Sequence, residues 1–276
     1  MTTTPMTTQA AAPVRPQHPE SSVRLLVSQT LVQTKRILTR WGRDRVTVME
    51  ALVLPVLFML VLYIVLGRLI YAITHDSALY SIVPLLALGG AISGSAFVAI
   101  DLMREQSSGL LTRLWVMPVH RASGPLSRII AEAVRIVVTT AVMLGAGVLL
   151  GFRFREGAMA AVMWMGIPVI FGMAFAALTT TVALYTSKTL VVEAVELWQL
   201  MLIFFSTGLL PLNQYPHWIQ PVVAHQPVSY AIAAMRGLSA GGPVLAPMIA
   251  TLLCSAGIAA ACVVPMAIGY RRASTH

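Results

Sequence analysis

The sequence predicts an all-α integral membrane protein with six transmembrane helices. Hydrophobic residues make up 57% of its 276 residues and charged residues only 11%, and apolar segments of membrane-spanning length recur along the chain. A soluble domain carries about 25% charged residues, whereas a helix needs about 20 apolar residues to cross a bilayer. The composition therefore excludes an ordinary soluble domain.

The N-terminal region precedes the first apolar segment. Residues 1–22 are rich in Thr, Pro and Ala and lack an apolar core, so we expect a disordered cytoplasmic tail and not a signal peptide. Residues 23–45 are predicted to form an amphipathic interfacial helix, with basic residues opposite an apolar side. That apolar side consists of Val27, Leu31, Thr34, Leu38 and Trp41. The helix is typical of a membrane surface, although a solvated helix packed on protein is the alternative.

Residues 46–276 are interpreted as one transmembrane domain with six apolar segments. The predicted spans are residues 46–66, 79–100, 129–151, 158–185, 194–212 and 244–268. An even number of spans puts both termini on one side of the membrane. Most of the 19 Lys and Arg residues fall on that same side, which predicts that both termini are cytoplasmic and that the protein lies in the cytoplasmic (inner) membrane.

A few ionisable residues fall within these spans. Glu132 lies between Arg128 and Arg135 on one face of the third span, which predicts an intrahelical charge cluster or, alternatively, a polar patch at the inner mouth of a pathway. Glu193 and Glu196 share a face at the start of the fifth span. There the helix dipole favours acids, although they could also pair with a partner protein.

Small residues recur four positions apart in two of the spans. Gly90 and Gly94 lie in the second span, and Gly147 and Gly151 in the third. Such pairs let helices approach closely, and general packing of the bundle explains them without a specific dimer motif.

The sequence gives no sign of an enzyme. Neither of its two lysines, Lys35 and Lys188, follows a glycine, so the chain has no Walker A phosphate loop. Cys254 and Cys262 are too far apart on one helix for a disulfide and have no histidine in the same run. We therefore expect no catalytic residue, no metal and no cofactor in this chain, and no nucleic-acid partner, since topology explains the net charge of +9.

The cytoplasmic loop at residues 101–128 is more than a linker. Leu110 to Trp115 form a short amphipathic pattern that Pro118 ends. An exposed apolar helix on such a loop is typical of a segment that docks into a groove of a partner, and a helix lying on the membrane surface is the alternative.

This loop resembles the segment after the second span in ABC-2-type exporter permeases. Family members show an Arg-Glu pair, a glycine, a short Leu-rich helix and a Pro-hydrophobic-x-Arg ending. The matching residues here are Arg104, Glu105, Gly109, Leu114, Pro118 and Arg121. His120 departs from the small hydroxyl residue often found at its position. The resemblance implies that this loop contacts an ATPase subunit.

A second resemblance to the same family lies between the fifth and sixth spans. The family pattern is Phe-x-Ser-Gly and Pro, then Pro-x-Trp-hydrophobic-Gln, Asn-Pro-x-x-Tyr and Ala-x-Arg. Its match here begins at Phe205 and includes Pro211, Pro216, Trp218, Pro227, Tyr230 and Arg236. Gln226 replaces the usual Asn, and Ala233 stands near where an acid often precedes the Arg, so Arg236 lacks an obvious neighbour.

We interpret residues 213–240 as a re-entrant helical hairpin that forms a lid on the outer side, before the sixth span. Prolines break the chain, and the short helices that follow are predicted to dip partway into the membrane and return. Trp218 and Tyr230 suit the interface, and Arg236 could snorkel outward. A plain interfacial loop is the alternative.

The resemblance covers residues 24–272 and is strongest to the daunorubicin-resistance subfamily, including membrane subunits of the mycobacterial exporter of phthiocerol dimycocerosate lipids. It implies a permease subunit that binds membrane lipids and pairs with a second, related but different permease. Two copies of an ATP-binding subunit would hold ATP and Mg. The implied cargo is hydrophobic or amphiphilic: a complex lipid such as phthiocerol dimycocerosate, or a drug such as an anthracycline.

A pathway for such a cargo is expected on faces of the first, second and fifth spans, which offer aromatic surface and few hydrogen-bonding groups. The candidate residues are Tyr63, Ser93, Gln199, Phe204 and Phe205. The alternative class is a stand-alone secondary transporter or a membrane-embedded enzyme. The former predicts ionisable residues near the membrane midplane, and the latter predicts clustered His, Asp and Glu.

Overall fold

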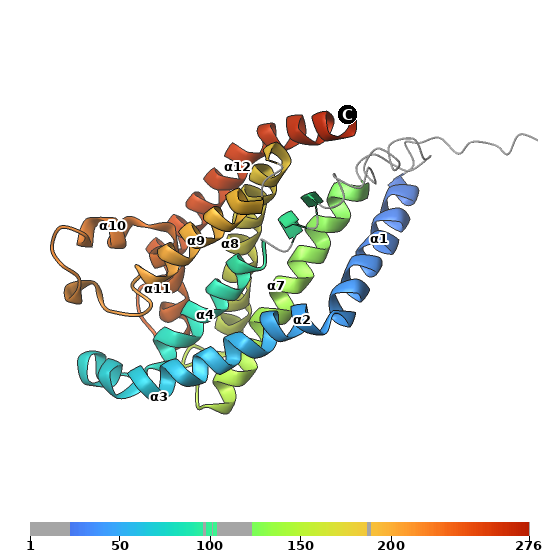
Figure 1. Ribbon diagram of the computed structural model, residues 1–276. Helices are drawn as coiled ribbons and strands as arrows, with labels where there is room; N and C mark the ends of the chain where they lie inside the picture. The colour runs from blue at the N-terminus through green and yellow to red at the C-terminus, as the bar shows by residue number, and fades with distance from the viewer. Residues whose placement is uncertain (1–22, 96–97, 101, 104–122, 187–188, 276) are drawn as a thin grey trace, which may run out of the picture.

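The computed structural model describes residues 23–95, 98–100, 102–103, 123–186 and 189–275, and these form helices and turns without a strand (Figure 1). Its helices are, in chain order, α1 Val23–Arg43, α2 Arg45–Val48, the π-helix η1 Met49–Val53, α3 Leu54–Thr74, α4 Leu79–Ser93, α7 Ser123–Leu149, α8 Gly157–Tyr185, α9 Thr189–Phe204, the 3-10 helix η2 Leu212–Gln214, α10 Gln220–His225, α11 Pro227–Ala240 and α12 Leu245–Thr275.

Five helical segments of the described chain are long and apolar enough to cross a membrane, and they coincide with five of the predicted spans. They are Arg45–Thr74, Leu79–Ile100, Leu126–Leu149, Gly157–Tyr185 and Leu245–Gly269. The prediction of an all-α integral membrane protein is confirmed.

The predicted span at residues 194–212 is represented by α9, which starts at Thr189 and ends at Phe204. Its 16 residues correspond to about 24 Å of helix, less than the roughly 30 Å of a hydrocarbon core. The prediction placed the end of this helix eight residues too late. The apolar letters continue past Phe204, but the chain turns at residues 205–210, where Ser206 Oγ bonds back to the carbonyl of Ile203.

The first span is longer than the sequence predicted. Its helix continues past residue 66 to Thr74, and His75 ends it in the left-handed conformation. Near its start, the five π-helical residues of η1 precede Pro55, which lies in the first turn of α3. A proline has no N–H to donate to the preceding turn, and a local widening of the helix accommodates this loss without a break.

The centre of the molecule is α4. Residues 78–88 are all buried, and α4 packs against α3, α7, α8, α9 and α11. At its N-terminal end Tyr80 contacts the ring of Phe152, with ring centroids 5.3 Å apart, and Phe152 in turn contacts Trp164 of α8. A helix buried on all sides shows little amphipathic pattern, which is why the sequence alone did not mark α4 as central.

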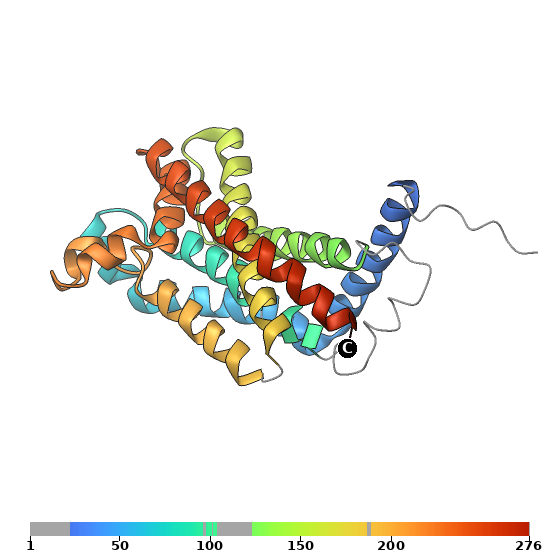
Figure 2. The same ribbon diagram turned by 90° about the horizontal axis from the view of Figure 1, so that it is seen from above.

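The two ends of the described chain lie at one end of the molecule. Both α1 and α12 have their free ends there in both views, whereas α10 lies at the opposite end (Figures 1 and 2). The long helices α8 and α12 pack side by side, and the hydroxyl of Tyr185 donates to the carbonyl of Pro265, 2.8 Å away.

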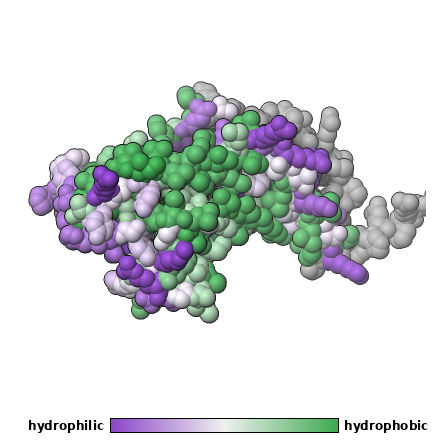
Figure 3. Space-filling view, turned by 90° about the horizontal axis from the view of Figure 1, so that it is seen from below, coloured by the Kyte–Doolittle hydropathy of each residue, from purple (hydrophilic) through white to green (hydrophobic). Residues whose placement is uncertain are grey.

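Much of the surface is apolar. Figure 3 shows a broad hydrophobic area across the middle of the molecule, with hydrophilic residues gathered toward its ends. On α3 alone, Phe58, Ile64 and Val65 are exposed. Exposed apolar surface of this extent is stable in lipid or against another subunit, but not in water.

The helix predicted at residues 23–45 is present as α1, but only part of its predicted apolar side is buried. Thr34 of that side is buried, and so is its neighbour Thr30, whereas Val27 and Leu31 of the same side are half exposed. The start of α7 explains this, because its Ser127 accepts a hydrogen bond at its carbonyl from Thr34 Oγ1. Polar residues of α1 therefore contact α7, and part of its apolar side stays uncovered.

Candidate functional site

A buried ion pair lies within α7. Glu132 and Arg135 are three residues apart, and their side chains meet with Nε to Oε2 at 2.9 Å and Nη2 to Oε1 at 2.5 Å. Only 3% of Glu132 and 5% of Arg135 is exposed. The charge cluster predicted from the sequence is confirmed for this pair. Its members lie deep between helices, however, where losing either partner would leave an uncompensated charge.

Arg135 also joins α7 to α4. Its Nη1 donates to the carbonyl of Gly90 at 3.4 Å, and its Nη2 donates to that of Ala91 at 3.3 Å. These carbonyls belong to the last turn of α4, which ends at Ser93. The last carbonyls of a helix lack partners within the helix, and the helix dipole favours a cation there. Arg135 therefore serves as a C-terminal cap of α4, supplied by a neighbouring helix.

Gly94 makes room for this cap. A Cβ added at Gly94 would overlap the Arg135 guanidinium, whereas one added at Gly90 would meet nothing. The expected close approach of helices is seen at Gly147, where an added Cβ would lie 2.8 Å from Val83 of α4. Gly94 instead leaves space for the Arg135 side chain, which crosses from α7 to α4. The four-residue spacing of glycines is the same in both cases, so the sequence could not show which role a given glycine has.

A second group of polar side chains joins α8 and α9 to Ser95, two residues beyond the end of α4. Ser95 Oγ lies 3.0 Å from Thr179 Oγ1 and donates to Glu196 Oε1 at 3.2 Å. Gln199 Nε2 donates to the same Thr179 hydroxyl at 3.0 Å, while the Oε1 of Gln199 is buried without a partner in the described residues. These contacts fix α9 against the core through hydrogen bonds, in a region where lipid offers none.

Glu193 and Glu196 were expected to lie in the first turn of the fifth span, where the helix dipole stabilises acids, and this prediction is wrong. Because α9 begins at Thr189, Glu193 and Glu196 lie beyond its first turn, where the dipole no longer stabilises them. Glu193 is exposed, whereas Glu196 is half-buried and accepts the hydrogen bond from Ser95. The sequence offered no signal for that contact, since 101 residues separate the two.

The predicted pathway residues do not share one environment. Phe204 and Phe205 are exposed at the end of α9, Ser93 is exposed at the end of α4, and Tyr63 is half-buried on α3. Gln199 is only 1% exposed and faces α8, so it does not reach the surface of this subunit.

The segment predicted as a lid forms two helices. The expected short helices correspond to α10 and α11, and Pro227 occupies the first turn of α11. Trp218 is exposed and Tyr230 is half-buried. Pro211 precedes η2 in an extended conformation, and Pro216 follows η2 and is exposed.

The sequence suggested that Arg236 has no hydrogen-bonding neighbour, but the structure shows two. Its Nη2 donates to Ser81 Oγ of α4 and to the carbonyl of Thr207, both at 3.0 Å. Instead of a carboxylate, a hydroxyl and a backbone carbonyl hold this guanidinium. The expected outward direction is therefore wrong: Arg236 joins α11 to the N-terminal end of α4 and to the turn after α9.

Gln226 also connects α11 to the turn after α9. Its Nε2 donates to the carbonyl of Phe205 at 2.5 Å and to Ser229 Oγ at 3.1 Å, and Ser229 Oγ accepts from the N–H of Thr207. A side-chain amide at this position thus satisfies a carbonyl that the end of α9 leaves open.

An exposed ion pair lies near the N-terminal end of α4. It joins Arg155, in the loop between α7 and α8, to Asp76, which precedes α4. Arg155 Nη2 lies 3.1 Å from Asp76 Oδ1, both side chains are about half exposed, and the guanidinium lies 4.9 Å from the centre of the Tyr80 ring. The hydrogen bond to Asp76 raises the pKa of Arg155.

The predicted ATPase-coupling residues lie outside the described part of the chain. They are Arg104, Glu105, Gly109, Leu114, Pro118 and Arg121. Their role stays a prediction, but they lie in the chain between α4, which ends at Ser93, and α7, which starts at Ser123, and these are the two helices that Arg135 joins.

Comparison with known proteins defines the class. The family model described as ABC-2 type transporter matches residues 28–239. The chain belongs to this family, and with its membrane-spanning helices it is a multi-pass cell membrane protein.

Individual relatives narrow the resemblance. The chain is 68% identical over 265 residues, 96% of each chain, to a probable doxorubicin resistance ABC transporter permease protein DrrC of Mycobacterium tuberculosis, in the CDC 1551 / Oshkosh and H37Rv strains alike. It is 23% identical over 268 residues, 94% of each chain, to the daunorubicin resistance ABC transporter permease protein DrrB1 of Streptomyces coeruleorubidus. The resemblance to daunorubicin-resistance permeases is thereby confirmed. These relatives are named as permeases, which are transport subunits and not enzymes.

Proposed function

We propose that this chain is the membrane-spanning permease subunit of an ATP-driven exporter that moves a hydrophobic or amphiphilic cargo out across the cytoplasmic membrane. The observation that carries the proposal is the match to the ABC-2 type transporter family over residues 28–239. The sequence has no Walker A loop, so the energy comes from a separate ATP-binding subunit, present in two copies and holding ATP and Mg. A second permease, related but different, completes the membrane part.

In the proposed topology α9 is a sixth, shorter span and both termini are cytoplasmic. The shared location of the free ends of α1 and α12 supports an even number of crossings (Figure 1). In this arrangement residues 1–22 form a cytoplasmic tail, residues 23–45 lie at the inner interface, and residues 46–276 form the transmembrane domain. Residues 213–240 cover the outer end as a re-entrant lid, held by the contacts of Gln226 and Arg236.

The ion pair in α7 suggests how a push on the cytoplasmic loop would reach the core. Residues 104–122 belong to the connection between α4 and α7, and Arg135 ties the end of α4 to α7 through two carbonyls. A displacement of the loop by the ATP-binding subunit would then move both helices together. Because α4 packs against five other helices, this movement would spread to the whole bundle.

The cargo is proposed to cross between this subunit and the second permease. Tyr63, Ser93, Phe204 and Phe205 remain candidates for that surface, because they are exposed or half-buried in the single subunit. The names of the relatives support an anthracycline, doxorubicin or daunorubicin, as one cargo. The extensive apolar surface in Figure 3 is equally compatible with a complex lipid such as phthiocerol dimycocerosate.

Co-purification with ATPase measurement tests the proposal. The chain is expressed with the products of neighbouring genes, and we expect a subunit with a Walker A loop to co-elute and to hydrolyse ATP faster in the complex. Doxorubicin and a phthiocerol dimycocerosate lipid are then added separately, and the true cargo raises the ATPase rate further. If no Walker-containing subunit associates, a stand-alone secondary transporter or membrane-embedded enzyme becomes the better interpretation.

A further inference from the structure

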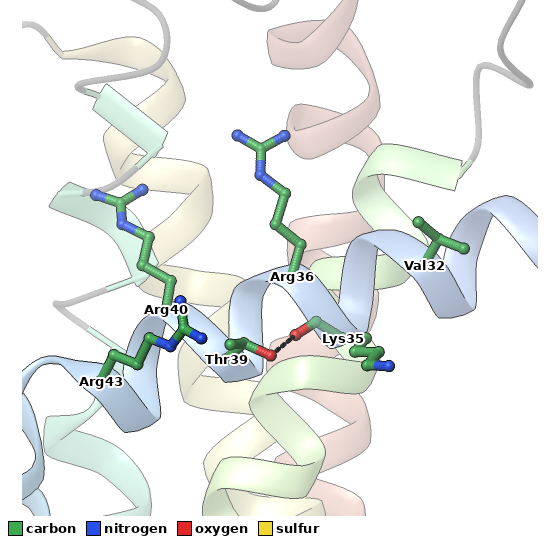
Figure 4. Close-up of a pocket in the computed structure, with 6 residues that line it drawn as sticks. All are labelled: Val32, Lys35, Arg36, Thr39, Arg40 and Arg43. Atoms are coloured by element: carbon green, nitrogen blue, oxygen red, sulfur yellow. Dashed lines mark hydrogen bonds between the residues drawn. The ribbon is translucent and has the colours of Figure 1, made fainter.

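A hollow lined by cationic side chains lies on α1, apart from the contacts described above. Its volume is about 540 Å³, and its lining residues are Val32, Lys35, Arg36, Thr39, Arg40 and Arg43. Figure 4 shows the side chains of Arg36 and Arg40 extending to the same side of the helix, while Thr39 Oγ1 is occupied by the carbonyl of Lys35. Four of the six lining residues therefore carry a positive charge.

No acid within α1 offsets these charges, because its sequence contains neither Asp nor Glu. Asp44 follows Arg43 directly, but its two oxygens accept hydrogen bonds from the N–H of Val46 and the hydroxyl of Thr47, which cap α2. The hydrogen bond from Thr47 lowers the pKa of this carboxyl, and the positive charge of Arg40 lowers it as well, so Asp44 both caps α2 and offsets part of the charge of Arg40. Because Arg40 has a further interaction within the chain, the cations of the hollow that no acid of α1 offsets are Lys35, Arg36 and Arg43, and an anion bound near them lowers their mutual repulsion.

The position of α1 relative to the spans indicates where the anion would come from. Arg43 is two residues before Arg45, where the first candidate span begins, and Thr34 bonds to Ser127 near the start of the span Leu126–Leu149. The cationic hollow thus lies at the level where two spans begin, which is the level of lipid headgroups.

Exposed apolar residues on α1 favour a lipid over a soluble anion. Leu31 is 58% exposed and Val32 is 67% exposed, and Val32 itself lines the hollow. A lipid offers both a phosphate for the arginines and acyl chains for the apolar residues, whereas a free phosphate offers only the first.

We propose that the hollow formed by Val32, Lys35, Arg36, Thr39, Arg40 and Arg43 binds the phosphate headgroup of an anionic phospholipid. The bound lipid fixes α1 at the membrane surface beside the start of α7. The site does not depend on which cargo the protein exports, and it is separate from the surface proposed for the pathway.

Native mass spectrometry of the full chain in detergent tests this proposal, with phosphatidylglycerol and phosphatidylcholine titrated separately. The wild-type chain is expected to bind phosphatidylglycerol more tightly. The double variant Arg36→Gln/Arg43→Gln should weaken that binding about 25-fold, at about fivefold for each cation. Arg40 is left intact because it has a further interaction within the chain.

The matched control is Arg24→Gln/Arg68→Gln, which removes the same charge from two exposed positions outside the hollow. It should keep wild-type affinity and selectivity, and both double variants should match the wild-type unfolding temperature. Equal binding of the two lipids by the wild-type chain, or an equal loss in both double variants, would overturn the proposal.

Two further outcomes would reassign the hollow. If millimolar inorganic phosphate displaces phosphatidylglycerol from the wild-type chain, the site takes free phosphate and the lipid assignment is wrong. If Arg36→Gln/Arg43→Gln leaves lipid binding unchanged but abolishes co-elution of an ATP-binding subunit, the surface serves a protein partner, and the proposal fails equally.

Discussion

Replacing Arg135 with methionine probes the connection between α4 and α7. The substitution removes two contacts to Glu132, at 2.9 and 2.5 Å, and two to the carbonyls of Gly90 and Ala91. Glu132, only 3% exposed, is then left without its cation. Breaking one side of a buried ion pair costs about 3–5 kcal/mol, so we expect Arg135→Met to lower the free energy of unfolding by about that amount.

A double variant shows how much of the expected loss of stability comes from the unpaired charge and how much from lost side-chain packing. Replacing both partners of a buried pair with apolar residues of similar size is often nearly neutral, so Glu132→Leu/Arg135→Met should be more stable than Arg135→Met alone. The measurement is unfolding in mixed micelles by titration with sodium dodecyl sulfate, followed by circular dichroism. Arg155→Met, which breaks the half-exposed pair with Asp76, is the control and should change stability far less. A wild-type midpoint for Arg135→Met, or additive losses in the double variant, would refute this account.

Three other predictions concern neighbouring parts of the structure. Gly94→Ala should destabilise the protein in the wild-type background but not together with Arg135→Met, whereas Gly90→Ala should be tolerated in both. The measurement is again the unfolding midpoint, and equal midpoints for the Gly94→Ala and Gly90→Ala variants would contradict this prediction. Arg236→Met should loosen the contact of α11 with Ser81 and Thr207 and increase protease cleavage within residues 205–240; an unchanged cleavage pattern would contradict it. Glu105→Ala should leave assembly with the ATP-binding subunit intact but reduce export for each ATP hydrolysed, and wild-type coupling would count against a role for that loop.

The positions of the long spans followed from the sequence because hydropathy and length alone determine them. Five of the six predicted spans match helices of sufficient length and apolarity. The end of α9 did not follow, since the apolar run continues beyond Phe204 while Ser206 bonds back to Ile203 and the N–H of Thr207 donates to the distant Ser229. Local composition does not reveal where tertiary hydrogen bonds stop a helix.

The directions of individual polar side chains also could not be predicted. The spacing of Glu132 and Arg135 indicated their pairing, because residues three apart share a helix face. It could not indicate that Arg135 continues to α4, nor that Gln199 faces α8 instead of a pathway. These contacts join residues that are 44 and 20 positions apart, and only the packing of the helices brings them together.

Transport in reconstituted vesicles tests the central claim most directly. Proteoliposomes are prepared with this chain, its partner permease and the ATP-binding subunit oriented outward, and uptake of doxorubicin into the lumen is followed by fluorescence. The account predicts uptake that requires both this chain and ATP, and that stops when the Walker A lysine of the ATP-binding subunit is replaced. Uptake driven by an ion gradient in vesicles that contain this chain alone would contradict it and establish a secondary transporter instead.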